Sequence, residues 1–578
     1  MQIYPASPRE TIRVTFEDGY ILEGPVGTTT HDFLRAAQER YQYNAPLMGA
    51  IVDGQLRELT YPVHRDANLA PVLLSSSDGG RIYRRSLVLL LATAAAELWE
   101  GCQVSVRYAV PDGGFYCTRL DDKPFTPIEL EQLEARMHQI VADDEPITKR
   151  SAPLEEIREI YQSRGENDKL RLLEMRLRPN LTIYGLRGRE DYYYGYMLPS
   201  TGYLRYFRLI WVKEGFILQY PRQEAPTTLR PIRAYDKLGK VFQQADEWLQ
   251  RMQVEDIGRL NRLVSQQKRL DELILVAEAL HEQNVAQIAR AITEQHHKRG
   301  VQLVLIAGPS SSGKTTFSKR LAIQLLAHGL RPATLEMDNY FVDRDLTPRD
   351  ENGDYDFEAL EAINLKLFNE QLLQLMQGAA VQIPHFNFLT GKSEPGRTAQ
   401  LLQDQILIIE GIHGLNPNLV PQIPKEKIFR VYVSALTQLN IDSHNRVPTT
   451  DVRLLRRIVR DARTRGYSAT DTLERWGSVR RGEKNNIFPY QENADAMFNS
   501  ALVYELAALK PIAAPLLLQV EPNTPPHIEA KRLLSFLNWV RPMKTEQMRL
   551  IPDTSLLREF IGGSILDDYH PSNPGGES

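Results

Sequence analysis

The chain has 578 residues, which is too long for a single domain and predicts about three to four. Charged residues make up 25% of the sequence and hydrophobic residues 42%, as is usual for globular proteins in solution. Because the formal net charge is only −4, the chain as a whole is not drawn to nucleic acid or to an anionic membrane. The only two cysteines, Cys102 and Cys117, are too few for a disulfide framework. The sequence after Met1 contains no apolar signal segment. Both observations lead us to expect a cytoplasmic protein without a membrane partner.

The first predicted unit, residues 1–75, has the pattern of a small β-grasp domain. Residues 12–16 alternate apolar and polar side chains, Asp18-Gly19 suits a hairpin turn, and Thr28–Thr30 can cap a helix. The sequence TIRVTFEDGYILEGPVGTT…AIVDGQLRELTYPV resembles the TGS domain of threonyl-tRNA synthetases. The unit contains no obvious catalytic residue, so we expect a folding or docking role.

Residues 76–235 are predicted to form a second, α+β domain. The polar, Gly-rich stretch Ser75–Gly80 favours a boundary, and Ser86–Trp99 is an apolar helix too short to span a bilayer. Thr126–Glu129 is a capping box with Pro at the first helical position. Tyr192–Tyr220 is rich in aromatic and β-branched residues, which favours strands.

Four segments of this unit resemble the second additional domain of threonyl-tRNA synthetases: IYRRSLVLLLATAAAELW, GGFYC, FTPIELEQLEARM and SRGENDKLRLLE. In that family an H-x-x-x-H pair and a C-x-x-x-H pair edit mischarged tRNA. The matching positions here are Arg85, Leu89, Tyr193 and Met197, which cannot replace the His/Cys geometry. The resemblance therefore implies an inherited scaffold without editing chemistry. A group of tyrosines favours a core, with a base-stacking site as the alternative: Tyr192, Tyr193, Tyr194, Tyr196, Tyr203 and Tyr206.

Residues 236–299 are predicted to be a helical connector that packs the front of the chain onto the rear. Leucines recur at helical spacing among many charged residues. His281, His296 and His297 lie here without an accompanying Asp, Glu or Cys cluster. We therefore expect solvated helix histidines rather than a metal site.

The strongest motif lies between a predicted strand, Val301–Ile306, and a predicted helix. It has the pattern G-x-x-x-x-G-K-[ST], whose backbone N–H groups and helix N-terminus form an anion site. Lys314 is expected to hold the β- and γ-phosphates of ATP, and the Thr315 hydroxyl to bind Mg²⁺. The residues of this phosphate-binding loop are Gly308, Pro309, Ser310, Ser311, Ser312, Gly313, Lys314, Thr315 and Thr316.

Two acidic residues close the next apolar strands. Asp338 follows the strand Ala333–Met337, and Glu410 ends the strand Gln405–Glu410. Ligands of open α/β sheets bind outside the carboxyl ends of the strands. Asp338 is therefore the candidate general base and a candidate Mg²⁺ ligand, and Glu410 is the candidate second Mg²⁺ carboxylate or the group that orients the base.

Residues 451–467 predict an amphipathic helix with a basic face. Arg453, Arg456, Arg457 and Arg460 recur at helical spacing. A solvated basic helix is one explanation of this stripe. The other is a lid that clamps the transferred phosphate and excludes water.

Together, GPSSSGKTTFSKRL, EMDNYF, ILIIEGIHGLNP and RLLRRIVRDARTRG resemble the phosphoribulokinase/uridine kinase family of P-loop kinases. With the front units and SLLREFIGGS, the chain is similar to bacterial uridine kinase-like proteins that carry synthetase-type N-terminal domains. The resemblance implies an α/β parallel-sheet kinase domain over residues 300–545 and a C-terminal tail over 546–578, whose end HPSNPGGES we expect to be disordered. It also implies that Asp338 is the base for a 5′-hydroxyl, and that Arg460 and Arg465 contact phosphate.

The resemblance also implies an acceptor pocket. Its substrate residues would be Asp356, Phe386, Phe388 and Arg457. The polar residues that read the pyrimidine in the family are replaced here, at Gly391, Tyr467 and Arg475. Loss of hydrogen-bonding groups removes discrimination between substrates.

The main functional hypothesis is an ATP- and Mg²⁺-dependent kinase whose small-molecule partner is a nucleoside-like hydroxyl acceptor. One alternative is a kinase of another acceptor, such as a sugar phosphate. The other is an RNA- or tRNA-associated protein in which ATP binding is regulatory and residues 1–235 bind the RNA. An oligomer is compatible with the sequence, which does not define the oligomeric state.

Overall fold

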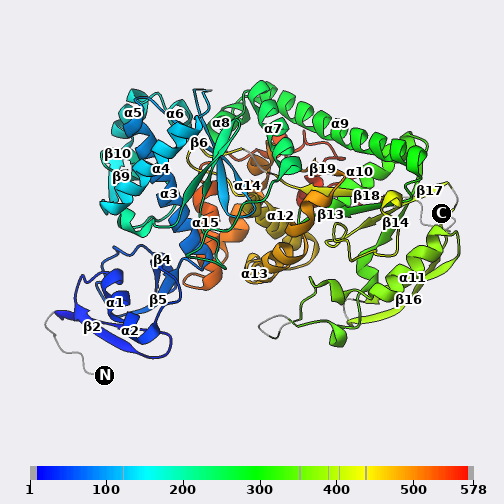
Figure 1. Cartoon of the computed structure of the whole chain (residues 1–578), viewed down its shortest axis with the longest axis horizontal. Coiled ribbons are helices and arrows are strands. Elements are labelled where there is room, and N and C mark those ends of the chain that lie inside the picture. The colour runs from blue at the N-terminus through cyan, green and yellow to red at the C-terminus, as the bar shows by residue number, and fades with distance from the viewer. Residues whose placement is uncertain are drawn as a thin grey trace.

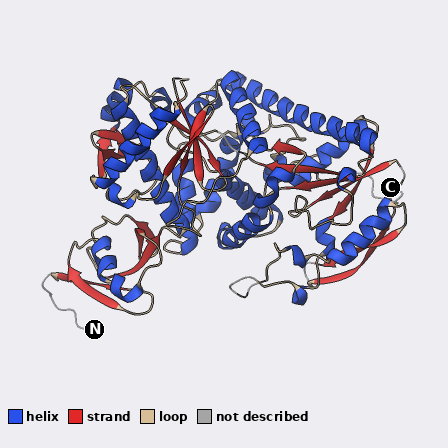
Figure 2. Cartoon of the chain, in the orientation of Figure 1, coloured by secondary structure: helices blue, strands red, loops and turns tan. Residues whose placement is uncertain are grey.

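The computed structural model describes residues 9–121, 123–349, 353, 355–387, 390–402, 404–436 and 439–569. Figure 1 shows a small module at the N-terminal end, a lobe of helices and strands beside it, and a second lobe that contains the later part of the chain. Helices surround the sheets in both lobes (Figure 2). No described helix combines the length and the hydropathy that a membrane crossing requires.

The N-terminal module is a five-stranded mixed sheet in the order β2-β1-β5-β3-β4. β1 pairs in parallel with β5, and the other pairs are antiparallel. The Thr29 side chain caps helix α1, whose Phe33 and Leu34 pack against the sheet. This is the predicted β-grasp arrangement. Its elements are β1 (Thr11–Thr15), β2 (Ile21–Pro25), α1 (Thr30–Ala36), α2 (Gln38–Tyr41), β3 (Leu47–Val52), β4 (Gln55–Arg57) and β5 (Ala67–Leu73).

The second unit combines one long helix with two antiparallel sheets, in the orders β11-β12-β7-β6 and β10-β9-β8. The predicted capping box of Thr126 and Glu129 is confirmed. Its elements are α3 (Ser77–Leu98), β6 (Val104–Val110), β7 (Gly114–Arg119), α4 (Pro127–Ala142), β8 (Thr148–Pro153), α5 (Leu154–Ser163), α6 (Asn167–Leu173), β9 (Asn180–Leu186), β10 (Arg189–Asp191), η1 (Thr201–Tyr203), β11 (Arg208–Val212) and β12 (Gly215–Gln219).

The Gly-rich stretch Ser75–Gly80 is mostly helix, where the sequence suggested a break. Ser76 caps helix α3, and the next four residues form its first turn. A Cβ at position 79 would lie 2.0 Å from the carbonyl oxygen of Leu73, so the glycine there lets the helix start against the preceding strand.

The predicted connector consists of three helices, α7 (Asp236–Arg251), α8 (Ile257–Val264) and α9 (Gln267–Arg299). The expectation of solvated histidines is wrong for His281, which is buried and makes a hydrogen bond with the carbonyl group of Ala501. Burial lowers the pKa of His281 to about 3, so the ring is neutral. A neutral core histidine anchors α9 to the rear lobe.

The rear lobe is built on a parallel sheet in the order β14-β17-β13-β18-β19. All five residues of β13 are buried, as expected for a central parallel strand. The strands are β13 (Leu303–Ala307), β14 (Arg331–Glu336), β17 (Gln405–Glu410), β18 (Ile428–Ser434) and β19 (Ala496–Asn499), with a separate hairpin of β15 (Val381–Asn387) and β16 (Lys392–Ala399).

The α-helices of this lobe are α10 (Lys314–Ala327), α11 (Leu365–Met376), α12 (Thr449–Thr464), α13 (Ala469–Asn486), α14 (Glu505–Leu518), α15 (Pro525–Leu537), α16 (Thr545–Met548) and α17 (Arg558–Ile561). Residues 546–569, which belong to the predicted tail, are folded: α17 packs against α12, and Phe560 is fully buried. The predicted disordered end, residues 570–578, lies outside the described residues.

One apolar core passes through both lobes. Tyr161 of α5 and Leu172 of α6 belong to the same buried cluster as Leu454 of α12 and Trp539, which follows α15. The front of the chain is therefore joined to the rear by shared packing rather than by a flexible link.

The loop between β18 and α12 enters the second unit. Asn440 donates hydrogen bonds to the carbonyl groups of Val106 and Arg107, and the backbone N–H of Ser443 donates to Asp168. The Tyr194 hydroxyl donates to the carbonyl oxygen of Arg446 at 2.7 Å. Contacts from the front of the chain thus set the position at which α12 begins.

A buried charge cluster holds this loop in place. The Asp191 carboxylate lies 2.5 Å from the Lys169 ammonium group and 2.6 Å from Nδ1 of His444, and all three side chains are almost fully buried. Burial alone would raise the pKa of Asp191, but Lys169 and His444 hold it below its usual value. Asp191 is therefore ionised in the folded protein.

Asp191→Asn should strongly destabilise the protein, because Lys169 and His444 would lose their buried counter-charge. We expect a loss of about 3–5 kcal/mol, measured as a lower thermal denaturation midpoint. The control is Glu155→Gln, which breaks an exposed pair with Arg158 and should cost less than about 1 kcal/mol. Equal shifts for the two variants would contradict a central role for the buried cluster.

Candidate functional site

The loop between β13 and α10 forms the predicted phosphate cradle. A Cβ at Gly308 would lie 1.9 Å from the carbonyl oxygen of Val433, so only glycine fits beside the neighbouring strand. Gly313 has a φ of +85°, and a Cβ there would lie 2.5 Å from the Leu556 side chain.

The N-cap residue of α10 is Gly313, which has no side chain to cap the helix. The Thr316 N–H of the first turn donates to Glu559 at 3.2 Å. The N–H groups of Lys314 and Thr315, at the start of the helix, are the ones that suit an anion.

Several polar atoms of this loop are buried without a partner in the described part of the chain. They are the hydroxyls of Ser311 and Ser312 and, from β17, the Oε2 atom of Glu410. Ser311 also adopts a left-handed backbone, with φ at +57°. Buried polar atoms without partners are costly in a stable fold and are typical of a site that waits for a ligand.

The two predicted acidic residues lie at the same edge of the sheet as the loop. Glu336 of β14 and Glu410 of β17 are paired in register, and Glu410 is also paired with Ile306 of β13. Asp338 follows in the short 3-10 helix η2 (Met337–Tyr340). The Thr315 hydroxyl donates to Oε1 of Glu410 at 2.9 Å. The structure thus joins the loop and Glu410 directly.

The positive charge of Lys314 acts on both Asp338 and Glu410. Burial raises the pKa of Glu410 to about 7, while Lys314 and the Thr315 hydrogen bond oppose the increase. Burial also raises the pKa of Asp338, again against the effect of Lys314. Two carboxyl groups with raised pKa values thus lie within the electrostatic influence of one ammonium group.

Three glutamates complete the site, and the sequence analysis missed them all. Glu483 of α13 accepts a hydrogen bond from the backbone N–H of Ser310 at 3.1 Å, and Glu559 of α17 accepts one from the Thr316 hydroxyl at 2.8 Å. Burial raises the pKa of Glu358 to about 7, helped by Glu483 and opposed by Arg457 and Lys314. These glutamates belong to no spaced motif, and only the fold brings them to the loop.

The predicted arginine stripe divides into two groups. Arg453 and Arg456 are fully buried and form ion pairs with Glu483 and Glu505, respectively, so they do not belong to a lid. Arg453 also donates to the carbonyl oxygen of Ser310 at 3.0 Å. Arg453 therefore supports the phosphate loop, while Arg456 joins α12 to Ser500 and Glu505.

The outer arginines gather around one carboxylate. Arg457, Arg460 and Arg465 all lie within ion-pair distance of Asp461. Arg457 donates to the Ser310 hydroxyl at 2.7 Å, and the Arg465 charge acts on Asp338. Burial lowers the pKa of Arg457, with Asp461 opposing it. This group contains Arg460 and Arg465, the two arginines for which the resemblance implies phosphate contact, and Arg457 joins it to the loop.

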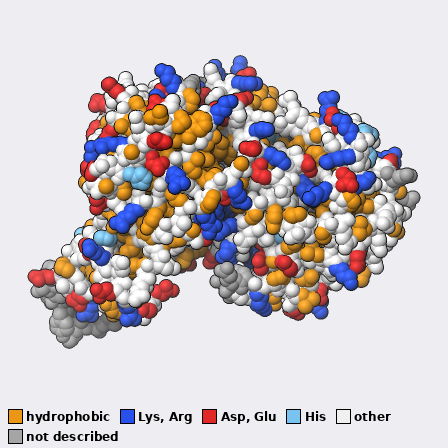
Figure 3. All heavy atoms as spheres, viewed as in Figure 1, with side chains coloured by type: hydrophobic (Ala, Val, Ile, Leu, Met, Phe, Trp, Pro, Cys, Tyr) orange, Lys and Arg blue, Asp and Glu red, His pale blue; other side chains and the backbone are white. Residues whose placement is uncertain are grey.

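Lys and Arg side chains also gather in the hollow between the two lobes, beside the position at which α13 is drawn (Figures 1 and 3). An anionic substrate that approaches this face meets a positive field.

The predicted acceptor residues are only partly assembled. The carboxylate of Asp356 accepts a hydrogen bond from the backbone N–H of Glu358 at 3.0 Å, which places it next to the site. Phe386 is buried, and its ring lies 5.5 Å from that of Phe341. Phe388 lies outside the described residues.

The three altered positions have close neighbours of their own. A Cβ at Gly391, where φ is +70°, would lie 2.8–2.9 Å from atoms of the Arg344 side chain. The Arg475 guanidinium lies 4.3 Å from the centre of the Tyr467 ring. A side chain that reads a pyrimidine does not fit at position 391 in this conformation.

The residues at the former editing positions are packed together without metal-binding groups. Leu89, Tyr193 and Met197 belong to one buried cluster, and Arg85 donates to the carbonyl oxygen of Tyr196 at 2.9 Å. Among the described residues no group of three or more His, Cys, Asp or Glu side chains could hold a metal ion.

Comparisons with known proteins divide the chain in the same way. Residues 303–507 match the model of the phosphoribulokinase/uridine kinase family. The N-terminal region matches threonine–tRNA ligases: that of Burkholderia lata is 36% identical over 170 residues, which are 29% of this chain and 27% of the ligase. The chain therefore spans about a quarter of the length of this relative.

Two solved structures show similarity to part of the chain. A possible uridine kinase from Bacillus stearothermophilus has a TM-score of 0.23 and 18% identity, over 34% of this chain and 88% of that one. A D-glycerate 3-kinase from Cryptococcus neoformans var. grubii has a TM-score of 0.25 and 17% identity, over 36% of this chain and 89% of that one.

Glu410→Gln should change how stability depends on pH. Because the folded-state pKa of Glu410 is raised from 4.5 to about 7, the protonated form stabilises the fold at low pH, and this contribution is lost as pH rises through 7. The variant should therefore gain thermal stability relative to the wild type as pH rises from 4.5 to about 7. The control is Glu370→Gln, an exposed position on α11, which should follow the wild type. Parallel pH profiles for Glu410→Gln and wild type would contradict the raised pKa.

Proposed function

Because residues 303–507 form a domain of the phosphoribulokinase/uridine kinase family, we propose that the chain transfers the γ-phosphate of ATP to a hydroxyl group of a nucleoside-like small molecule. The observation that carries this proposal is the hydrogen bond from Thr315 to Glu410 beside Lys314 and Asp338. A phosphate cradle, a carboxylate and a base candidate then share one edge of the sheet.

The loop residues 308–316 would hold the phosphates of ATP through backbone N–H groups, with Lys314 placed on the β- and γ-phosphates. Thr315, Glu410 and Asp338 would hold Mg²⁺, and the partnerless Oε2 atom of Glu410 supports this assignment. When bound, Mg²⁺ neutralises charge on the β- and γ-phosphates. Glu410 must be ionised for this role, and its pKa of about 7 allows that near neutral pH.

Asp338 is the proposed general base. A carboxylate whose pKa is raised by burial accepts a proton more readily than a solvated one, and Lys314 beside it keeps the ionised form accessible. In the proposed reaction, the acceptor hydroxyl passes its proton to the Asp338 carboxylate while its oxygen attacks the γ-phosphorus. The bond to the leaving ADP oxygen then breaks.

The proposed role of Arg457, Arg460 and Arg465 is to stabilise negative charge on the transferred group and to exclude water. Their shared carboxylate, Asp461, is buried and holds the three guanidinium groups together before a substrate arrives. Preorganised charge of this kind needs little rearrangement during the reaction.

On the acceptor side, we propose that Asp356 and Arg457 bind the polar part of the substrate and that Phe386 and Phe388 bind its apolar face. The contact of Gly391 with Arg344 favours a broader acceptor class than pyrimidine nucleosides. A sugar phosphate is the second candidate, because an arginine beside the site suits an anionic acceptor.

A separate candidate is RNA binding by residues 1–235, supported by the match with threonine–tRNA ligases. The full chain should then bind tRNA with an affinity that falls as salt rises. Absence of binding at low salt would exclude this candidate.

Asp338→Asn should reduce ATP-dependent phosphorylation by about 100- to 10,000-fold, since the amide cannot accept the proton. The measurement is ADP release in the presence of an active acceptor. Asp345→Asn, an exposed neighbour in the same loop region, is the control and should keep full activity. Full activity of Asp338→Asn would remove Asp338 as the base.

A panel of nucleosides and sugar phosphates should identify the acceptor. With ADP and Mg²⁺ present, the true acceptor class should raise the thermal denaturation midpoint, and Arg457→Ala should abolish the shift. Turnover of sugar phosphates alone would replace the nucleoside assignment. Absence of turnover with every compound would contradict the kinase proposal for these acceptors.

A further inference from the structure

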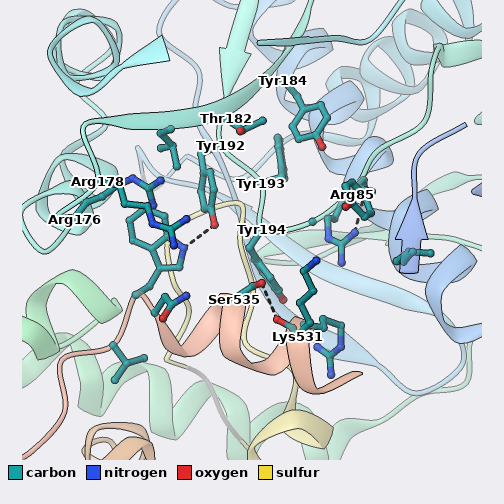
Figure 4. A pocket seen from close by; sticks show the side chains of 18 of the residues that line it. Arg85, Arg176, Arg178, Thr182, Tyr184, Tyr192, Tyr193, Tyr194, Lys531 and Ser535 are labelled. Carbon is teal, nitrogen blue, oxygen red and sulfur yellow. Dashed lines mark hydrogen bonds between the residues drawn. The ribbon is translucent and has the colours of Figure 1, made fainter. Parts of the chain in front are cut away.

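A second cavity lies away from the phosphate loop, between the front and rear of the chain. Its volume is about 690 Å³, which is within the usual range for small-molecule sites. Gln55 of the N-terminal module, Arg85 and Tyr192 of the second unit, and Lys531 and Trp539 of the rear lobe all line it. Figure 4 shows Tyr192, Tyr193 and Tyr194 facing Lys531 and Ser535 of α15 across this space, with Arg176 and Arg178 at one side and Arg85 at the other.

The lining is strongly cationic. In the part of the chain that the structure describes, no carboxylate lies within ion-pair distance of five lining residues: Arg85, Arg176, Arg178, Lys510 and Lys531. The one acidic residue in the lining, Asp78, is already paired with Arg81 at 2.8 Å. An excess of positive charge in a partly enclosed space attracts an anion.

Arg85 is the clearest case. Its guanidinium donates to the carbonyl oxygen of Tyr196 at 2.9 Å and stacks near the Tyr194 ring at 5.6 Å. Burial lowers its pKa to about 10. A Cβ at Gly195 would lie 2.5 Å from the guanidinium carbon, so the backbone there is shaped around this side chain. Arg85 is half-buried. A cation taken partly out of water without a counter-ion is costly, and an anionic ligand would supply one.

Aromatic rings form the rest of the lining. The Trp539 indole N–H donates to the Tyr192 hydroxyl at 2.6 Å, and the two rings meet edge to face. The hydroxyl of Tyr193 is buried without a partner among the described residues. Tyrosine and tryptophan side chains offer flat apolar faces with polar tips.

We propose that this cavity is a second binding site, for a nucleoside phosphate whose phosphates contact the cations and whose base packs against the tyrosines and Trp539. Arginine binds phosphate oxygens through paired N–H groups, and bases stack on aromatic rings. The cavity does not include the phosphate loop, so this ligand is additional to ATP.

A chain of contacts connects the cavity with the phosphate loop. Tyr194 donates to the carbonyl oxygen of Arg446, just before α12, and Arg532 pairs with Asp451 in the first turn of α12. The same helix carries Arg453 and Arg457 to Ser310. A ligand that orders Tyr194 and Arg532 therefore acts on the position of α12. The site is regulatory, and its effect on phosphoryl transfer rests on the proposed kinase function.

The test measures nucleotide stoichiometry on the full chain by calorimetry, with ADP, GDP, CDP and UDP as probes and no acceptor present. The wild type should bind at least one of them at two sites. Arg178→Glu combined with Lys531→Glu changes two exposed side chains at the cavity and should weaken the second site by about 10- to 100-fold. The matched control, Arg299→Glu with Lys425→Glu, reverses two exposed charges elsewhere and should retain both sites.

Retention of both sites in the cavity variant, or a single site in the wild type for every probe, would overturn the proposal. Inorganic pyrophosphate that binds as tightly as the nucleotides would overturn the role of the aromatic rings. Binding of tRNA that is lost in the cavity variant, without nucleotide binding, would assign the cavity to RNA instead.

Coupling between the cavity and the phosphate loop is tested by binding alone, without turnover. The measurement is the difference in ATP affinity of the phosphate loop between protein with the cavity filled and protein with the cavity empty. Tyr194→Phe, which removes the hydrogen bond to Arg446, should reduce that difference. Equal ATP affinity in the two states would overturn the coupling while leaving the second site intact. Because no phosphoryl transfer is measured, failure of the kinase proposal would not affect this result.

Discussion

The contact between Glu483 and the backbone of Ser310 is the interaction on which the candidate site depends. Glu483 is buried, accepts the Ser310 N–H, and forms two hydrogen bonds with the Arg453 guanidinium. Burial would raise the pKa of Glu483, but Arg453 and Arg480 keep it below its usual value. The ionised carboxylate of Glu483 thus fixes the phosphate loop to both α12 and α13. With α12 fixed in this way, Arg457 on the same helix reaches the Ser310 hydroxyl.

Local sequence was sufficient to predict features that lie within a single helix, strand or loop. The strand Gln405–Glu410, the capping box at Thr126 and the loop from Gly308 to Thr316 were all predicted from short patterns. Glu410 was predicted because it ends an apolar strand, and the structure places it 2.9 Å from Thr315. Each of these features is decided by residues that are neighbours in the chain.

Features that depend on distant partners were not predictable in this way. Glu358, Glu483 and Glu559 reach the site from three separate elements, and no spacing rule links them to the loop. The arginine stripe was identified, but periodicity could not show that Arg453 and Arg456 face buried glutamates. His281 was expected in solvent, and local sequence could not reveal its partner, the carbonyl group of Ala501, which lies far along the chain.

The end of the described chain closes the phosphate loop, and this limits how the protein can be shortened. Leu556 packs against Gly313, and Glu559 holds the backbone and hydroxyl of Thr316. The family model matches residues 303–507, a span that ends well before Leu556 and Glu559. A fragment trimmed to that span would keep the four kinase motifs and still lack Leu556 and Glu559, which form one side of the phosphate loop's surroundings. During translation, this side of the loop is added only after α17 has left the ribosome.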